Sequence, residues 1–209
     1  MQQRRLLIKL LFEFQCQLQY QLIHHDPIHQ IYKCLLVFCL DASKGIEDYS
    51  KDPCILTNNG VTIENDYFVF NGNNYITTNY SNKLNFSSGD FTIDIIMNLS
   101  TENEGRAYPS ILSGKDGWNY GANGLRWHGT HRRNGFAVFL NPGDPLFSSN
   151  TSFTPNNDTF IKYTVQRRSG LWEQYFDEVK DSTTVNNSQE FDLYHTTGMS
   201  IGCSLWDRI

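Results

Sequence analysis

The sequence predicts an all-β protein built as a two-sheet antiparallel β-sandwich. Three observations predict this fold class: short segments in which apolar and polar residues alternate, turn-forming residues between those segments, and a near absence of helical periodicity after residue 33. The chain has 209 residues, of which 39% are hydrophobic. A chain of this length buries roughly 70% of its unfolded surface, which is enough for one sizeable core.

The N-terminal segment, residues 1–33, differs from the rest of the chain because it is rich in Gln and Leu and contains no glycine. Within it, residues 12–22 alternate between an apolar residue and Glu or Gln, the pattern of a strand with one buried face. We therefore expect a boundary near residue 34, with residues 1–33 as a candidate additional strand and residues 34–209 as the folded domain. A less regular helical stripe is the alternative, and it runs through Leu7, Leu11, Phe14 and Leu18.

The clearest strand of the folded domain covers residues 91–99. Its odd positions are apolar, whereas Thr92, Asp94 and Asn98 are polar. Because successive side chains of a strand point to opposite faces, we expect the odd positions to face the core.

Three more apolar or alternating runs follow this strand. Residues 136–140 are almost entirely apolar, and residues 161–166 alternate again. Residues 172–176 come after the turn-forming pair Ser169 and Gly170. The last two runs are therefore expected to pair as a hairpin.

Turn chemistry separates the expected strands. Asn–Gly pairs begin at Asn59, Asn71, Asn123 and Asn134, and both residue types tolerate the positive φ of tight turns. Three prolines fall within residues 141–158. We expect that segment to be a loop, because proline cannot donate a backbone hydrogen bond to a sheet.

Charge, hydropathy and cysteine spacing exclude several classes of protein. Lys and Arg total 17 against 22 Asp and Glu, a formal net charge of −5, so there is no overall basic field and no nucleic-acid partner is expected. The longest apolar runs fall far short of the roughly 20 residues that span a bilayer, so no transmembrane segment is expected. The five cysteines include no Cys-x-x-Cys pair, so they are predicted to be small buried side chains rather than a zinc or redox site.

Several stretches resemble, in the same order, laminin G-like domains of the concanavalin A-like jelly-roll fold. Residues 70–78 (FNGNNYITT) and 84–94 (LNFSSGDFTID) look like the opening strands of such domains. Further matches lie downstream, and a first strand of the same kind lies upstream. They are residues 111–115 (ILSGK), 135–140 (GFAVFL), 163–170 (YTVQRRSG), 175–180 (YFDEVK) and 35–41 (LLVFCLD). The resemblance covers residues 34–209.

One feature of that family is not matched. A closing strand normally follows the segment that resembles residues 199–202, whereas this chain ends at Ile209. Two expectations arise: the chain is truncated before its closing strand, or residues 12–22 supply the missing strand, because an unpaired sheet edge invites strand addition.

The resemblance implies a non-catalytic recognition module that binds a glycan or a surface protein. Such modules occur in secreted and cell-surface adhesion proteins and in phage or virus tails, so an extracellular, cell-surface or virion-associated location is expected. Relatives commonly hold calcium on the rim of the sandwich, which makes calcium the cofactor that the resemblance implies, with no ligands assigned. Two other functions remain alternatives: a glycoside hydrolase of the same fold, and a structural virion or assembly domain without a ligand.

Sugar binding needs aromatic faces that stack on a pyranose ring, together with amide and guanidinium groups that bond its hydroxyls. Residues 116–133 have that composition and are predicted to form a loop region. Core packing is the alternative for the two tryptophans there, and burial is expected for Trp172 and Trp206. The candidate carbohydrate-binding residues are Trp118, Asn119, Tyr120, Asn123, Arg126, Trp127 and His128.

A retaining glycoside hydrolase would instead need two carboxylates about 5–5.5 Å apart. The candidates are Glu173, Asp177 and Glu178, whose spacing differs from the Glu-x-Asp-x-x-Glu pattern of the glucanases with this fold. Asp177 and Glu178 also align with a hairpin turn of the resembled family. We therefore expect them to be turn residues, and we expect no enzymatic activity.

Overall fold

A computed structural model of the chain describes most of the expected domain and one segment before it. The residues described are 6–14, 35–71, 73–79, 81–99, 110–114, 124–128, 135–139, 146–151, 159–191, 193 and 198–202. Their regular structure consists of fifteen β-strands and one 3-10 turn at Asn82–Leu84. None of the described residues forms a helix with the length and hydropathy needed to cross a bilayer.

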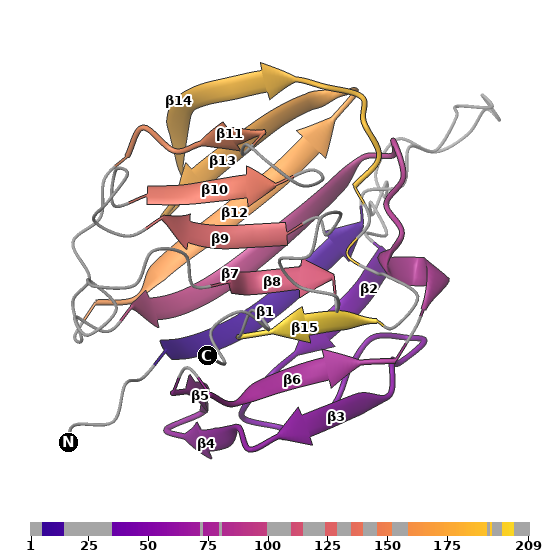
Figure 1. Cartoon of the computed structure of the whole chain (residues 1–209), viewed down its shortest axis with the longest axis vertical. Coiled ribbons are helices and arrows are strands. Elements are labelled where there is room, and N and C mark those ends of the chain that lie inside the picture. The colour runs from indigo at the N-terminus through magenta and orange to yellow at the C-terminus, as the bar shows by residue number, and fades with distance from the viewer. Residues whose placement is uncertain are drawn as a thin grey trace, which may run out of the picture.

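The strands form two antiparallel sheets that lie one over the other (Figure 1). Sheet A contains, in spatial order, β14 (Val179–Asn186), β13 (Leu171–Phe176), β12 (Ile161–Arg168), β7 (Phe91–Leu99), β1 (Leu6–Phe14), β5 (Tyr67–Phe70) and β4 (Thr62–Glu64), with β2 (Leu35–Leu40) also paired with β1. Sheet B contains β11 (Phe147–Ser148), β10 (Gly135–Phe139), β9 (Gly124–His128), β8 (Ser110–Gly114), β15 (Met199–Ile201), β6 (Tyr75–Thr78) and β3 (Leu56–Asn59). The predicted all-β sandwich is confirmed.

One hydrophobic core fills the space between the sheets. Ile93 and Val165 of sheet A and Ile201 of sheet B all have no exposed surface in it. Phe136 of sheet B stacks on Tyr163 of sheet A with ring centroids 4.5 Å apart. Burial of such apolar surface is the main force that holds two sheets face to face.

The alternating strand at residues 91–99 folds as predicted. On β7, Phe91, Ile93, Ile95 and Met97 are buried in the core. Asp94 points to the opposite face and is partly exposed. The period-2 pattern was therefore sufficient to place this strand and its inner face.

The hairpin predicted from residues 161–176 is also present. β12 pairs with β13 in antiparallel register, and the turn residues Ser169 and Gly170 have φ values of 49° and 80°. The next turn, Asp177 and Glu178, has φ values of 49° and 71° and connects β13 to β14. Two central residues with positive φ match the right-handed twist of the strands that they connect.

The described N-terminal strand begins before the predicted one. β1 covers Leu6–Phe14 and overlaps the expected residues 12–22 only at its end, while residues 15–34 lie outside those described. The alternative helical stripe is not observed at Leu7, Leu11 and Phe14, which are all in this strand. Pairing with β7 on one side and with β2 and β5 on the other selects the consecutive apolar run, as is typical of a strand inside a sheet.

The predicted loop at residues 141–158 contains a short strand. β11, Phe147–Ser148, pairs with β10 at the edge of sheet B. A two-residue strand has no periodicity to detect, so its partner rather than its sequence defines it.

A buried carboxylate holds the loop after β2. Asp48 accepts backbone N–H bonds from Cys39 and Ser50, both at 3.0 Å, and from Cys54 at 2.7 Å. The Lys83 ammonium lies 2.7 Å from the same carboxylate. Burial alone would raise the pKa of Asp48, but Lys83 and these N–H groups outweigh it, so the pKa lies below its ordinary value of 3.8.

We expect this carboxylate to make stability depend on acid pH. Because the pKa of Asp48 is lowered in the folded protein, its stabilisation is present above the unfolded pKa and is lost as the pH falls through the folded value. Asp48→Asn should therefore reduce the urea midpoint at pH 6 and flatten its decline between pH 5 and pH 2. Urea unfolding across that range is the measurement, and Asp66→Asn, in the exposed β4–β5 turn, is the matched control. Parallel pH profiles for the wild type and Asp48→Asn would contradict this role.

Candidate functional site

Sheet B has one face against the core and one face away from it. Ile76 on β6, Leu112 on β8 and Phe136 on β10 belong to the core. Alternate positions along the same strands face the other way. We name the face that points away from the core the sheet B outer face, and define it by Tyr75, Thr77, Ser113, Ala137 and Ser200.

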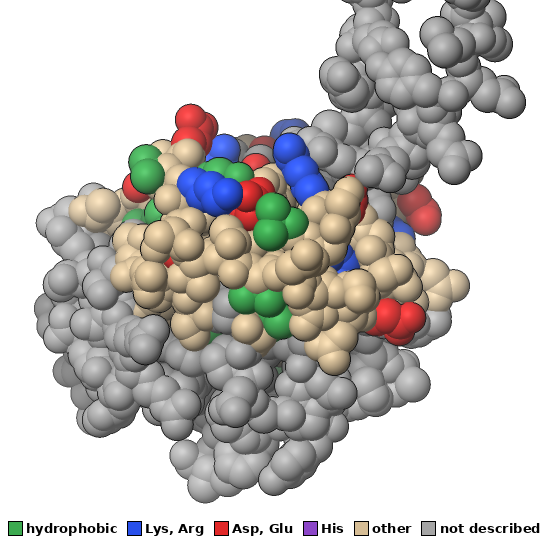
Figure 2. All heavy atoms as spheres, turned by 90° about the horizontal axis from the view of Figure 1, so that it is seen from above, with side chains coloured by type: hydrophobic (Ala, Val, Ile, Leu, Met, Phe, Trp, Pro, Cys, Tyr) green, Lys and Arg blue, Asp and Glu red, His purple; other side chains and the backbone are tan. Residues whose placement is uncertain are grey.

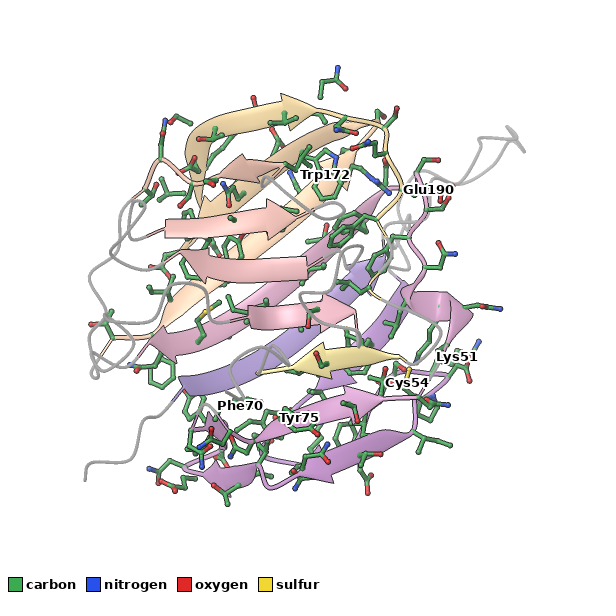
Figure 3. The ribbon with its side chains drawn as sticks, viewed as in Figure 1. Lys51, Cys54, Phe70, Tyr75, Trp172 and Glu190 are labelled. Carbon is green, nitrogen blue, oxygen red and sulfur yellow. The ribbon has the colours of Figure 1, made fainter. Side chains whose placement is uncertain are left out.

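The centre of the sheet B outer face is made of small side chains and hydroxyl groups. The Ser113 and Ser200 hydroxyls lie 2.8 Å apart and share a hydrogen bond between β8 and β15. Both side chains are buried, whereas Tyr75 at one side of the face is partly exposed. Figure 3 shows Tyr75 on β6, on the sheet nearer to the viewer. The face thus combines paired hydroxyls with an accessible aromatic ring.

β9 brings three of the predicted binding residues together. Arg126, Trp127 and His128 are consecutive on this strand, so the loop expected over residues 116–133 is wrong for residues 124–128. The other four candidates, Trp118, Asn119, Tyr120 and Asn123, lie outside the described residues.

The register of β9 divides these three positions between two faces. Arg126 pairs with Ala137, and His128 pairs with Gly135. Because paired positions of antiparallel strands share a face, the positions of Arg126 and His128 are on the sheet B outer face. Trp127 is paired with Phe136, whose ring is buried in the core, so its register position favours the alternative of core packing.

A second polar cluster lies on the outer face of sheet A, which we name the Glu173 cluster. Its members are Gln166, Glu173, Tyr175 and Lys180. Glu173 accepts hydrogen bonds from Gln166 at 2.5 Å and from the Tyr175 hydroxyl at 3.0 Å, and it forms an ion pair with Lys180. Figure 2, which looks onto the β14 end of the sandwich, shows acidic and basic side chains gathered on one side of it.

The Glu173 cluster does not provide the acid that a hydrolase needs. The Lys180 ammonium, followed by Gln166 and Tyr175, lowers the pKa of Glu173 below its ordinary value, whereas a catalytic general acid needs a raised pKa. Asp177 and Glu178 form the β13–β14 turn, as predicted. Gln166, Tyr175 and Lys180 were not identified from the sequence as partners of Glu173. Gln166 and Tyr175 could have been placed on its face from their alternation with the buried residues of β12 and β13.

The described residues show no assembled metal centre. No group of three or more His, Cys, Asp or Glu side chains among them could hold a metal ion. Asp90, which lies in a strand connection, accepts the backbone N–H of Ser169 at 2.7 Å. Its carboxylate therefore helps to fix the β12–β13 turn against the start of β7.

Comparison of the chain with models of known protein families, with curated proteins and with solved structures finds no match in any of the three. The resemblance to laminin G-like domains therefore rests on the stretches of sequence quoted above alone.

Proposed function

We propose that this protein is a non-catalytic recognition module that binds a glycan on the sheet B outer face. The observation that carries the proposal is the register of β9, which sets the positions of Arg126 and His128 beside the hydroxyl-lined centre formed by Ser113 and Ser200. Guanidinium and imidazole groups supply the donors and acceptors that sugar hydroxyls need, and Tyr75 offers a ring for stacking. The buried Ser113 and Ser200 hydroxyls bond each other and hold β8 beside β15, so they do not contact the glycan themselves.

The resemblance supports the same function, because laminin G-like and concanavalin A-like domains commonly serve as lectin-like adhesion modules. It also supports an extracellular, cell-surface or virion-associated location, which we include in the proposal. A surface protein as the ligand is the alternative within this class.

A glycan array probed with the full chain tests the proposal. We expect binding to a restricted set of glycans and a loss of at least about tenfold in affinity for Arg126→Ala, because one bidentate donor contributes roughly 1.5 kcal/mol or more. Arg168→Ala, an exposed arginine on sheet A, is the matched control and should bind as the wild type does.

Other outcomes of the same experiment would overturn the proposal. Binding that is equal for Arg126→Ala and the wild type would remove the sheet B outer face as the site. Cleavage of a polysaccharide that stops in Glu173→Gln would establish a hydrolase. An array without signal, combined with saturable binding to a cell-surface protein, would replace the glycan by a protein ligand.

A further inference from the structure

The strand β1 is paired along both of its edges. One edge pairs with β7 from Leu6 to Glu13. The opposite edge is shared, because residues 6–8 pair with β5 and residues 10–14 pair with β2. β1 therefore lies inside sheet A, although it comes from the N-terminal end of the described chain.

Without β1, sheet A would divide into separate parts. β14, β13, β12 and β7 form one continuous part, and β5 with β4 forms another. Among the described strands, β1 alone pairs with both parts and with β2 (Figure 1). The strands formed by residues 35–202 thus leave a space one strand wide between β7 on one side and β5 and β2 on the other.

The sequence of β1 suits such a space. It reads LLIKLLFEF, a mostly apolar run with the composition of a strand that is covered on both faces. Recognition of an added strand through its backbone hydrogen bonds is a general mode of peptide binding, in which alternate side chains give specificity. In sheet A, β7 supplies those bonds on one side of β1, and β5 and β2 supply them on the other.

We propose that residues 35–202 form a binding slot for an extended, mostly apolar peptide strand, and that the chain fills this slot with its own residues Leu6–Phe14. β1 is in this sense a ligand connected to its receptor through residues 15–34. The inference is independent of glycan binding, because it concerns the interior of sheet A.

The test uses the full chain, folded and then cut. A recognition sequence for a site-specific protease replaces residues 17–22, and cleavage removes the covalent connection while leaving every described strand pair in place. We expect the N-terminal fragment to co-elute with the remainder and the far-ultraviolet β signal to persist. The unfolding midpoint should become dependent on protein concentration, because two pieces must now associate.

Exchange of the strand is the second readout. A labelled peptide of residues 1–14, added in excess, should replace the cut fragment. The same peptide with Leu10→Pro should not bind, because Leu10 is paired with Leu40 on one side and Ile95 on the other and proline removes a backbone donor. In the uncut chain, Leu10→Pro should lower the melting temperature clearly, whereas Gln3→Pro, before the strand, should not.

Three results would overturn the inference. The cut fragment could leave while the remainder keeps its β signal and melting temperature. The cut chain could lose its sheet structure without recovering it when peptide is added. The proline peptide could bind as well as the unchanged peptide.

Discussion

Arg167→Met is expected to lower the free energy of unfolding by about 3 kcal/mol or more. The Arg167 side chain has no exposed surface. Its guanidinium lies 5.0 Å from the ring centroid of Phe91 and 5.1 Å from that of Trp172, and it donates to the carbonyl oxygens of Gly89 and Gln189, each at 2.8 Å. It also donates to the carbonyl oxygens of Phe86 at 3.2 Å and Ser87 at 2.6 Å. Methionine keeps apolar contact with the rings but removes all of these donors, and the loss of the bond to the carbonyl of buried Phe86 is the costly change.

The adjacent Arg168 provides the matched control. Its side chain is exposed at the end of β12, so Arg168→Met should change the free energy of unfolding by less than about 0.5 kcal/mol. Urea unfolding of both variants measures the difference. Equal midpoints would show that Arg167 does not hold residues 86–89 and Gln189 against β12. Figure 3 shows Trp172 and Glu190 near the end of the sandwich at which β12 ends.

Gly198→Ala is expected to have an effect of similar size, about 3 kcal/mol or more. Gly198 has a φ of +102°, and a Cβ at this position would lie 2.0 Å from the carbonyl oxygen of Thr78. That oxygen belongs to the backbone of β6, so the contact can be relieved only by moving β15 away from its neighbour. β15 is an inner strand of sheet B, so the movement would weaken its backbone hydrogen bonds to both β6 and β8.

Gly45→Ala separates the two causes of that effect. Gly45 also has a positive φ, +118°, but its added Cβ would meet only the Tyr49 hydroxyl at 3.6 Å. This variant should therefore lower the free energy of unfolding only by the strain of a non-glycine residue at positive φ, about 1–2 kcal/mol. Thermal unfolding of both variants is the measurement, and a Gly198→Ala midpoint no lower than that of Gly45→Ala would contradict the close approach of β15 to β6.

The sequence was sufficient where a local pattern and its partner agree. Phe91, Ile93, Ile95 and Met97 of β7 face the core, and Ser169–Gly170 forms the turn that its residues predicted. Asp177–Glu178 forms the turn that the resemblance implied. Burial of Trp172 was also predicted from its place in a strand, and the ring is fully buried. In each case the signal lies within ten residues.

The sequence was insufficient where a distant partner decides the structure. The described N-terminal strand covers the apolar run at residues 6–14 and shares residues 12–14 with the alternating segment, while residues 15–22 lie outside the described residues. A strand that pairs with β7 on one edge and with β5 and β2 on the other suits a consecutive apolar run, which the alternation did not indicate. Register, which single-sequence patterns do not contain, also decides which face a residue occupies.

The candidate site shows the same limit. Seven residues were grouped by composition in an expected loop, but residues 124–128 form β9. Strand alternation then sets the positions of Arg126 and His128 apart from that of Trp127. The hydroxyl-lined centre was not predictable, because Ser113 and Ser200 are 87 residues apart and meet only through the pairing of β8 with β15.

The most direct test of glycan recognition on the sheet B outer face is backbone amide shift mapping by NMR during titration with the strongest ligand from the glycan array. The account predicts shifts at Thr77, Ser113, Arg126 and Ser200, and none at Thr164, Gln166 or Tyr175 on the opposite side of the sandwich. Saturable shifts confined to the strands that carry the Glu173 cluster would contradict it.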